Sequence, residues 1–293
     1  MADLSVVVVT YDALPWLEQC LESVAGHDVV VVDHGSTDGT LDLVRDRFPH
    51  VRIVEQENRG MGGGNNAGMR VSDARYFLLL NSDAWVVGDA IERLVAFADE
   101  HPEAAVVGPR LRNVDGTIQR SVRGFPTLWR LATEYLYLRK LAPRSRLLNA
   151  FYGAGFDHET AREVDWLFGP CLLVRRDASD AVGLFDESFF MFSEEVDWCW
   201  RFHTAGWKVF FFPVAEVVHV GGASHGGRLY RENLRGHLRF FAKHSGLREA
   251  ERVRRLLLWS LRARALVSRG EQGRQYRDGA RFLGSGSARS LIS

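Results

Sequence analysis

Leu4-Ser-Val-Val-Val-Val-Thr10 opens the chain with a run that is mostly apolar and β-branched. Such a run is typical of a strand that is buried on both faces of a sheet. Leu14–Val24 follows with helical spacing, and strands and helices then alternate as far as Gly108. The further strands are expected at Val29–Asp33, Val51–Glu55, Tyr76–Leu80 and Ala104–Gly108, and the further helices at Thr37–Arg47, after the glycines of Met61–Met69, and at Ala90–Glu100. This alternation predicts an α/β fold with a mostly parallel, Rossmann-like sheet flanked by helices.

The regular alternation stops after Pro109. We expect a hairpin turn at Asn113–Thr117, a helix at Thr127–Leu141, an apolar segment at Trp166–Val174, strands at Lys208–Phe212 and Val214–Val220, and basic helices at Tyr230–His244 and Leu247–Arg269. The predicted organisation is therefore an α/β domain at 1–227, a basic helical extension at 228–283, and a disordered Gly/Ser-rich tail at 284–293.

Composition and charge narrow the class of protein. The cysteines Cys20, Cys171 and Cys199 are scattered and odd in number, which indicates a reducing compartment and neither a disulfide framework nor a zinc site. We see no signal peptide, and no segment approaches the ~18 uninterrupted apolar residues of a spanning helix. The net charge of zero hides a basic end, because residues 228–293 carry a net charge of +11 and the rest of the chain −11. This asymmetry predicts an anionic partner at the C-terminal end.

Polar residues follow four successive predicted strands. They are Thr10, Tyr11 and Asp12, then Asp33, then Asn58, and finally Asn81, Ser82 and Asp83. Ligands bind outside the C-terminal ends of the strands in open α/β sheets. Helix capping and turn formation explain some of these residues, but they explain less well why all four strand ends are polar. We therefore expect a ligand site at this edge.

Two features near these strand ends suit a phosphorylated ligand. The glycine-rich segment Gly60–Gly68, with Gly63 and Asn65, can cradle phosphate at the start of a helix, or it can be a tight strand-to-helix turn. Asp83 suits a hard divalent cation, which takes carboxylates and substrate phosphates as ligands. His219 ends another predicted strand and can add a nitrogen ligand, although a lone histidine in that place is more often structural.

An acidic helix is predicted to begin near Ser193, in the segment Met191–Gly206. Ser193 can cap this helix, and Asp197 then faces Arg201 one turn later. Glu194, Glu195 and Asp197 are candidates for a general base at the rim of the core, because a carboxylate there can accept the proton of a substrate hydroxyl. The alternative is a capped helix with a salt bridge.

Taken together, these segments resemble the inverting family-2 glycosyltransferases of the GT-A fold, in particular their rhamnosyltransferase-like branch. The resemblance covers about residues 3–245. It rests on Val6–Asp12, Val31–Thr40, Asn58–Gly68, Leu79–Asp83, Gly169–Arg176 and Gly183–Arg201. It implies a nucleotide-sugar half at 1–109 and an acceptor half at 110–227.

The resemblance also implies roles for single residues. Thr10, Asp12 and Asp33 hold the nucleoside, Asp83 binds Mg²⁺ or Mn²⁺ across the diphosphate, and His219 completes the metal site. Glu195 matches the acid that is usually an aspartate in this family and acts as the base, with Glu194 as its competitor. Trp198 and Trp200 can pack against a sugar or in the core. The sequence departs from the family pattern at Asp12, His34, Ser82 and Glu195.

The basic helices have two interpretations. The apolar and arginine residues of Leu247–Arg269 suit an anionic membrane surface, and they equally suit a helix packed on the domain with a solvated basic face. Arg228, Arg231 and Arg235 recur at helical spacing and can hold a diphosphate, from donor or acceptor. Nucleic acid is not expected, because no aromatic stacking platform accompanies the charge.

The leading hypothesis is an inverting, metal-dependent glycosyltransferase that uses a nucleoside-diphosphate sugar, with dTDP-L-rhamnose as the favoured donor. The expected acceptor is a glycan or a polyprenyl-diphosphate-linked glycan in cell-wall or polysaccharide biosynthesis. We expect the protein to be cytoplasmic and attached peripherally to the inner face of the cell membrane. The alternatives are a sugar-phosphate nucleotidyltransferase, and a non-catalytic scaffold that binds glycan or lipid through a degenerate site.

Overall fold

The computed structural model describes residues 3–141, 145, 147–148, 156–221 and 227–293, and the chain divides into two compact units. The sheet unit comprises residues 1–123, 157–190 and 195–221. The helical unit comprises residues 124–156, 191–194 and 222–293. The expected boundary at residue 227 does not anticipate that residues 124–156 group with the C-terminal helices.

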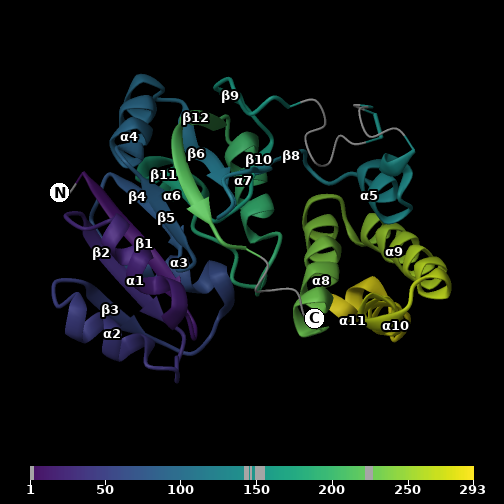
Figure 1. Cartoon of the computed structure of the whole chain (residues 1–293). Helices are drawn as coiled ribbons and strands as arrows, with labels where there is room; N and C mark the ends of the chain where they lie inside the picture. Colours follow the sequence, from purple (N-terminus) through teal and green to yellow (C-terminus); the bar gives the residue numbers. More distant parts are fainter. Residues whose placement is uncertain (1–2, 142–144, 146, 149–155, 222–226) are drawn as a thin grey trace. The chain divides into compact units, whose positions relative to one another are not determined.

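The sheet unit is built on one sheet with the main strand order β3-β2-β1-β4-β11-β6-β12-β5 (Figure 1). Its strands are β1 (Leu4–Thr10), β2 (Asp28–Asp33), β3 (Arg52–Glu55), β4 (Tyr76–Asn81), β5 (Ala84–Val87), β6 (Ala104–Arg112), β7 (Ile118–Gln119), β9 (Arg162–Glu163), β11 (Cys171–Arg175) and β12 (Lys208–His219). A two-stranded sheet adds β8 (Val122–Arg123) and β10 (Trp166–Leu167). Strands β1 to β4 run parallel, as does the pair β6 and β12, whereas β11 and β5 are antiparallel to their neighbours. The predicted mostly parallel α/β sheet is confirmed.

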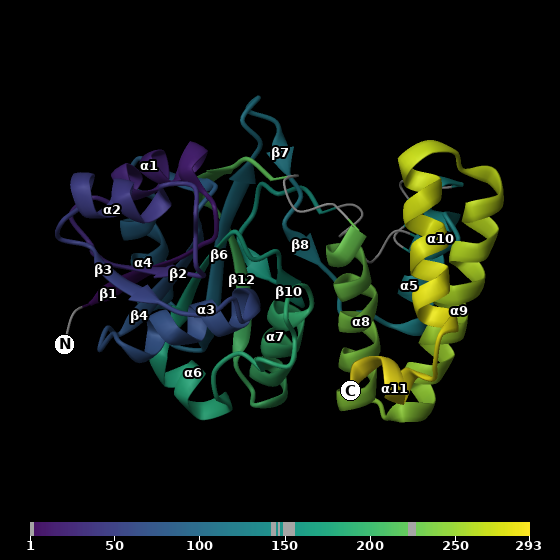
Figure 2. The same cartoon turned by 90° about the horizontal axis from the view of Figure 1, so that it is seen from below.

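Helices cover both faces of this sheet, and Figure 2 shows α1 and α2 on one side and α3, α6 and α7 on the other. The helices of the sheet unit are α1 (Leu14–Ser23), α2 (Thr40–Arg47), α3 (Gly60–Arg70), α4 (Ala90–Glu100), α6 (Arg176–Val182) and α7 (Glu194–Thr204), whose first residue belongs to the helical unit. Val6 and Val8 pack in one core with α1, α2 and α4, while Val7 and Val9 approach α3. Burial from both sides explains why β1 is a continuous apolar run.

Two expectations for the second half of the chain are corrected. The two strands predicted at Lys208–Phe212 and Val214–Val220 are one strand, β12, whose pairing with β6 is irregular between Phe212 and Glu216. Pro213 lies within that irregularity, where a strand tolerates its missing amide proton. The single helix predicted at Thr127–Leu141 is α5 (Leu128–Tyr135) followed by a short 3₁₀ turn at Leu138–Lys140.

The helical unit consists of α5 together with α8 (Gly227–His244), α9 (Leu247–Val267), α10 (Gly270–Gly284) and α11 (Ala288–Ile292). Helix α9 packs against α8 and α10 through one face, on which Val253, Leu257 and Leu261 are fully buried. The tail at 284–293, expected to be disordered, instead contains α11, whose Ala288 amide donates to Glu251 on α9. Within the described residues, no helix is both long and apolar enough to cross a bilayer.

Candidate functional site

The C-terminal ends of β1, β2 and β4 bring the predicted polar residues together. Thr10 pairs with Asp33 on β2, and Val9 pairs with Asn81 on β4, so the three strands end side by side. The chain leaves β1 toward β2 on one side, whereas β4 lies on the other side. A reversal of strand order of this kind is where open α/β sheets bind their ligands.

Asp12 and Asp33 organise the loop that follows β2. The Asp33 carboxylate is buried and accepts hydrogen bonds from the amides of Gly35 and Ser36, both at 2.9 Å, and from the Ser36 hydroxyl at 2.5 Å. Asp12 accepts from the Thr37 amide at 2.7 Å, and its own amide donates to Ser36 Oγ. These acids therefore fix the conformation of the loop that follows β2.

Thr10 and Tyr11 offer groups that the protein itself does not use fully. The Thr10 hydroxyl oxygen is buried, and it has no hydrogen-bond partner among the described residues. Buried polar atoms of this kind are normally hydrogen-bonded, so the Thr10 hydroxyl is a candidate to bond a ligand at this strand end. Tyr11 is exposed at the same end of β1, where its ring can stack on a base.

His34 is the buried neighbour of these groups. Its Nε2 lies 3.0 Å from Gln56 Nε2, and a Cβ on Gly64 would lie 2.9 Å from the same ring nitrogen. Burial lowers the pKa of His34, against the opposing effect of Asp33. Burial therefore makes this ring harder to protonate than an exposed imidazole.

The glycine-rich segment forms the helix α3 itself, and neither of the two expected interpretations describes it fully. A Cβ on Gly64 would lie 2.7 Å from Val9, and one on Gly68 would collide with Val7, so these glycines let α3 lie close against β1. At the start of the helix, the amides of Gly60 and Met61 donate to Asn58 Oδ1 and Phe190 O. The predicted Gly63 and Asn65 are buried in α3. The first two amides are thus used within the protein.

Asn66, which the sequence did not single out, has a clear positioning role. Its amide nitrogen donates to Phe185 O and Glu187 Oε1, both at 2.9 Å, and its oxygen accepts from the Phe185 amide at 3.0 Å. This buried contact fixes the chain at 185–187, which leads toward the acidic helix. Phe185 and Glu187 lie 119 and 121 residues from Asn66 along the chain, and no local sequence pattern points to them.

Asp83 and His219, the predicted metal ligands, lie together. Asp83 is in the turn between β4 and β5, and β5 pairs with the end of β12 so that Ala84 faces His219. His219 Nε2 is 3.3 Å from Asp83 Oδ1, and the two side chains are 5% and 25% exposed. The predicted Ser82 occupies the same turn.

A carboxylate oxygen and an imidazole nitrogen at this separation fit a divalent cation that takes its remaining ligands from water and a diphosphate. Among the residues that the structure describes, no cluster of three or more Asp, Glu, His or Cys completes a protein cage. A cation that a protein shares with substrate phosphates is usually bound through only one or two side chains of the protein.

The acidic helix α7 separates its three acids into different environments. Asp197 is fully buried and accepts a hydrogen bond from Arg201 Nε at 2.9 Å, as the spacing predicted. Asp197 is thus a structural ion-pair partner and a poor candidate base. Glu194 is 8% exposed, and Glu195 is more accessible. Ser193 precedes them with a φ of 72°, outside the extended geometry of a usual helix cap.

Trp198 is buried in the core, which is one of the two alternatives that the sequence left open for it. It is 1% exposed, and its indole nitrogen donates to Gly183 O at 2.8 Å. Its ring contacts those of Phe185 and Phe202, with centroids 4.0 and 4.9 Å away. No face of the ring is left for a substrate.

Arg231 is committed to a partner in the helical unit. Its guanidinium binds Asp278 through two hydrogen bonds of 2.7 and 2.5 Å. This pairing weakens the expectation that it holds a diphosphate. Arg228 lies in the first turn of α8, but its side chain is outside the described residues.

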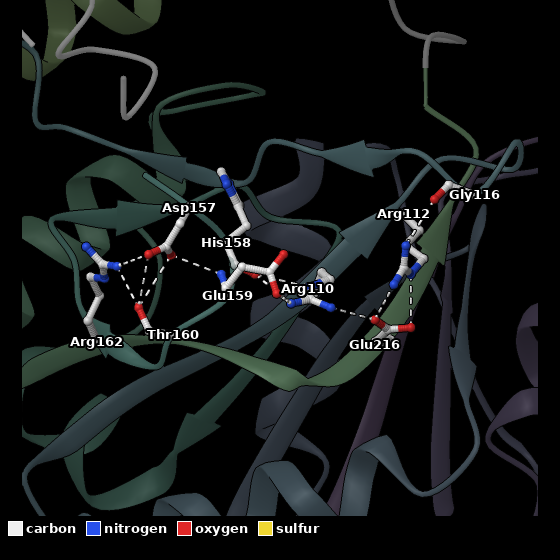
Figure 3. Close-up of polar contacts among 9 residues, drawn as sticks. All are labelled: Arg110, Arg112, Gly116, Asp157, His158, Glu159, Thr160, Arg162 and Glu216. Carbon is white, nitrogen blue, oxygen red and sulfur yellow. Dashed lines mark hydrogen bonds and ion pairs between the residues drawn. The ribbon is translucent and has the colours of Figure 1, made fainter. Parts of the chain in front are cut away.

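A second charged cluster lies on β6, β12 and the segment at 157–162, and it is already neutralised (Figure 3). Arg112 binds Glu216 through two hydrogen bonds, and Arg110 contacts Glu216, Glu159 and the carbonyl oxygen of His158. Arg112 and Arg110 lower the pKa of Glu216. This network ties strands together and offers no uncompensated charge to a ligand.

Comparison with known proteins identifies the same family that the sequence resembles. The family model described as Glycosyl transferase family 2 matches residues 5–182. An N-acetylglucosaminyl-diphospho-decaprenol L-rhamnosyltransferase of Mycobacterium tuberculosis H37Rv is 34% identical over 281 residues, which cover 88% of this chain and 89% of the relative. The low-salt glycan biosynthesis hexosyltransferase Agl10 of Haloferax volcanii is 26% identical over 222 residues, covering 74% of this chain and 67% of that protein.

Solved structures show the fold alone. GalNAc-T7, with UDP, GalNAc and Mn²⁺, has a TM-score of 0.60 at 15% identity, covering 82% of this chain and 48% of that chain. S. aureus TarS 1–349 in complex with UDP has a TM-score of 0.55 at 18% identity, covering 94% and 78%. The GT-A fold expected from the sequence is confirmed.

Proposed function

This chain belongs to glycosyl transferase family 2, and we propose from this membership and from its site that it inverts the anomeric centre of the sugar it transfers. The proposed donor is dTDP-L-rhamnose, and the proposed acceptor is a polyprenyl-diphosphate-linked sugar. The similarity to a rhamnosyltransferase of lipid-linked N-acetylglucosamine, which spans nearly the whole of both chains, favours these substrates. The observation that carries the proposal is the Asp83–His219 pair at the sheet edge.

The proposed reaction is a single displacement. The acceptor oxygen forms a bond to the anomeric carbon while the bond from that carbon to the diphosphate oxygen breaks, and a carboxylate takes the acceptor proton. Glu195 is the proposed base and Glu194 the competitor, because Asp197 is fully buried against Arg201. Thr10, Asp12 and Asp33 are proposed to bind the nucleoside at the ends of β1 and β2.

Asp83 and His219 are the residues proposed to hold Mg²⁺ or Mn²⁺. When bound, such a cation offsets the charge that develops on the departing nucleoside diphosphate. Through such a cation, Asp83 and His219 would orient the diphosphate so that its sugar faces the acceptor.

The direct test supplies the purified protein with dTDP-L-rhamnose or UDP-sugars, an N-acetylglucosaminyl-diphospho-polyprenol acceptor, and Mg²⁺ or Mn²⁺. We expect a rhamnosylated lipid whose anomeric configuration is opposite to that of the donor. Transfer with retention would refute the displacement. Formation of a nucleotide sugar from a sugar phosphate would instead support a nucleotidyltransferase, and binding without turnover would support a scaffold.

The helical unit is proposed to bind the anionic surface of the membrane that holds such an acceptor. One face of α9 is buried, whereas Arg252, Arg255, Trp259, Arg262 and Leu266 are exposed at helical spacing on another face. Trp259 and Leu266 are 65% and 88% exposed. A face that mixes arginines with apolar side chains suits an interface of lipid headgroups.

Vesicle sedimentation tests this attachment. We expect binding to anionic vesicles that weakens with added salt, because each Lys or Arg near such a surface contributes about 1 kcal/mol within a Debye length. Trp259→Ser should weaken binding, while Val114→Ser, a control at an exposed apolar residue of the sheet unit, should not. Equal binding to neutral and anionic vesicles would refute the electrostatic part of the proposal.

A further inference from the structure

The His219 ring is held on several sides by the protein. Its Nδ1 lies 2.8 Å from Gln119 Oε1 on β7, while Nε2 faces Asp83. Phe168 meets the ring edge-on, with centroids 5.9 Å apart. A Cβ on Gly221 would approach the Gln119 amide nitrogen to 3.2 Å and the His219 ring to 3.4 Å. The ring therefore cannot turn without disturbing its neighbours.

A series of hydrogen bonds determines which atom donates and which accepts in the contact between Gln119 and His219. It begins at the Asp115 carboxylate, whose pKa is held below its usual range by the hydroxyl and the amide of Thr117. An ionised carboxylate only accepts hydrogen bonds, so the Thr117 hydroxyl donates to Asp115 at 2.6 Å. That hydroxyl oxygen then accepts from Asn113 Nδ2 at 2.8 Å.

The same logic continues to the histidine. The Asn113 side chain donates to Thr117 through Nδ2, so its Oδ1 is left to accept a hydrogen bond. Gln119 Nε2 donates that hydrogen bond, at 3.0 Å. Gln119 must then present its own oxygen to His219 Nδ1. An amide oxygen cannot donate, so Nδ1 carries the proton that makes this hydrogen bond. Nε2 remains as the ring nitrogen that faces Asp83.

The hairpin between β6 and β7, which contains Asp115, Thr117 and Gln119, is fixed to the strand that carries His219. Arg112 donates to the carbonyl oxygen of Gly116, in the hairpin turn, at 3.0 Å (Figure 3). The same guanidinium binds Glu216 on β12 at 2.6 and 2.9 Å, and Glu216 precedes His219 by three residues. Arg112 on β6 thus contacts both the hairpin that carries Gln119 and the strand that carries His219, and it fixes the two relative to each other.

We propose that Gln119 is a positioning residue, which, through Asn113, Thr117 and Asp115, keeps the proton of His219 on Nδ1 and leaves Nε2 to bind a divalent cation with Asp83. This inference rests on the proposed function, because it concerns the metal site assigned there. Gln119 acts through His219 and need not touch the substrate. A hydrogen bond of this kind to a ligating histidine fixes its tautomer and its orientation.

Two substitutions at Gln119 separate its acceptor from its volume. Gln119→Met fills similar space without an acceptor for the Nδ1 proton, whereas Gln119→Glu keeps an acceptor oxygen. Ile118→Val is the matched control, because Ile118 is on the same strand and is partly exposed. Melting temperatures without metal ensure that each variant is folded.

The first measurement is the ¹⁵N spectrum of histidine-labelled protein, which distinguishes protonated from unprotonated ring nitrogens and needs no activity. We expect a protonated Nδ1 at His219 in the wild type and in Gln119→Glu, and its loss or exchange in Gln119→Met. The His219 signals are assigned from those missing in His219→Gln.

The second measurement is Mn²⁺ binding, followed by electron paramagnetic resonance with a saturating nucleoside diphosphate. We expect Gln119→Met to bind Mn²⁺ about 10- to 100-fold more weakly, with Gln119→Glu and Ile118→Val near the wild type. A wild-type ring protonated on Nε2 alone, or a Gln119→Met variant with unchanged spectrum and affinity, would overturn the inference. A protonated Nδ1 in a wild type that binds no Mn²⁺ would remove the metal from the proposed function, while the positioning of His219 by Gln119 would stand.

Discussion

Asp197 was a candidate base by sequence, and its substitution distinguishes a structural from a catalytic carboxylate. Arg201, its partner one turn later, also donates to the carbonyl oxygens of Val182 and Leu184 at 2.7 and 2.8 Å. The ion pair therefore ties α7 to the chain that follows α6. Asp197→Asn keeps the size of the side chain and a hydrogen-bond acceptor but removes the negative charge.

The cost of this change follows from the burial of both partners. Asp197 is fully buried and the Arg201 side chain is 19% exposed, so the substitution leaves a largely desolvated cation without its anion. Breaking a buried pair by removing one partner costs about 3–5 kcal/mol. Since asparagine keeps one hydrogen bond, we expect about 3 kcal/mol, which corresponds to a drop in melting temperature of roughly 6–12 °C.

Denaturant unfolding and calorimetry measure this loss, and rates of transfer are compared below the melting range of the variant. Asp180→Asn, at an exposed acid on α6, is the control and should change neither stability nor rate. We expect Asp197→Asn to lose stability and to keep its turnover within about tenfold. A variant destabilised by less than about 1 kcal/mol whose turnover falls by 10²-fold or more would show that the carboxylate takes part in the reaction.

Three further predictions concern single acids. Asp83→Asn should reduce transfer by about 10²-fold or more and weaken Mn²⁺ binding with the fold retained, and full transfer in excess chelator would contradict the metal role. Glu195→Gln should lower turnover by about 10²-fold or more with donor binding nearly intact, whereas the same phenotype in Glu194→Gln alone would move the base by one residue. Arg254 holds the pKa of Glu251 at about 2, below its usual 4.5. The ionised Glu251 therefore stabilises the folded protein above pH 4.5, and this stabilisation is lost as the pH falls toward 2. Glu251→Gln should reduce the change in melting temperature between pH 4.5 and 2. Plots of melting temperature against pH that run parallel for the variant and the wild type would refute this contribution.

The parallel core and the acidic helix could be predicted from sequence because their signals are local. Strand β1 begins and ends where its apolar run does, and α4 coincides with the predicted Ala90–Glu100. The Asp197–Arg201 pair follows from helical spacing alone. Each of these features is encoded within about twenty residues, by burial on both faces of a strand or on one face of a helix.

The contacts that sequence reasoning missed join residues far apart in the chain. Gln119 and His219 are separated by 100 residues, and Asn66 and Phe185 by 119. No local sequence pattern identifies a polar side chain whose partner lies on a distant antiparallel strand or in a distant buried loop. The sequence left the role of the glycines of α3 open for a related reason, because a glycine needed for close packing on β1 has the same sequence signal as one needed in a turn.

The two halves of the proposed site are built by different parts of the sheet. Thr10 and Asp33 are placed by neighbouring parallel strands, so the proposed nucleoside contacts depend on the first half of the chain. His219 reaches Asp83 only because β5 pairs antiparallel with β12, and its ring is oriented from the β7 hairpin. Disturbing the hairpin should therefore weaken metal binding while leaving the nucleoside contacts at β1 and β2 unchanged. The parallel strands β1 and β2 thus supply one half of the proposed site, as in other open α/β sheets. The antiparallel pair β5 and β12 supplies the other half.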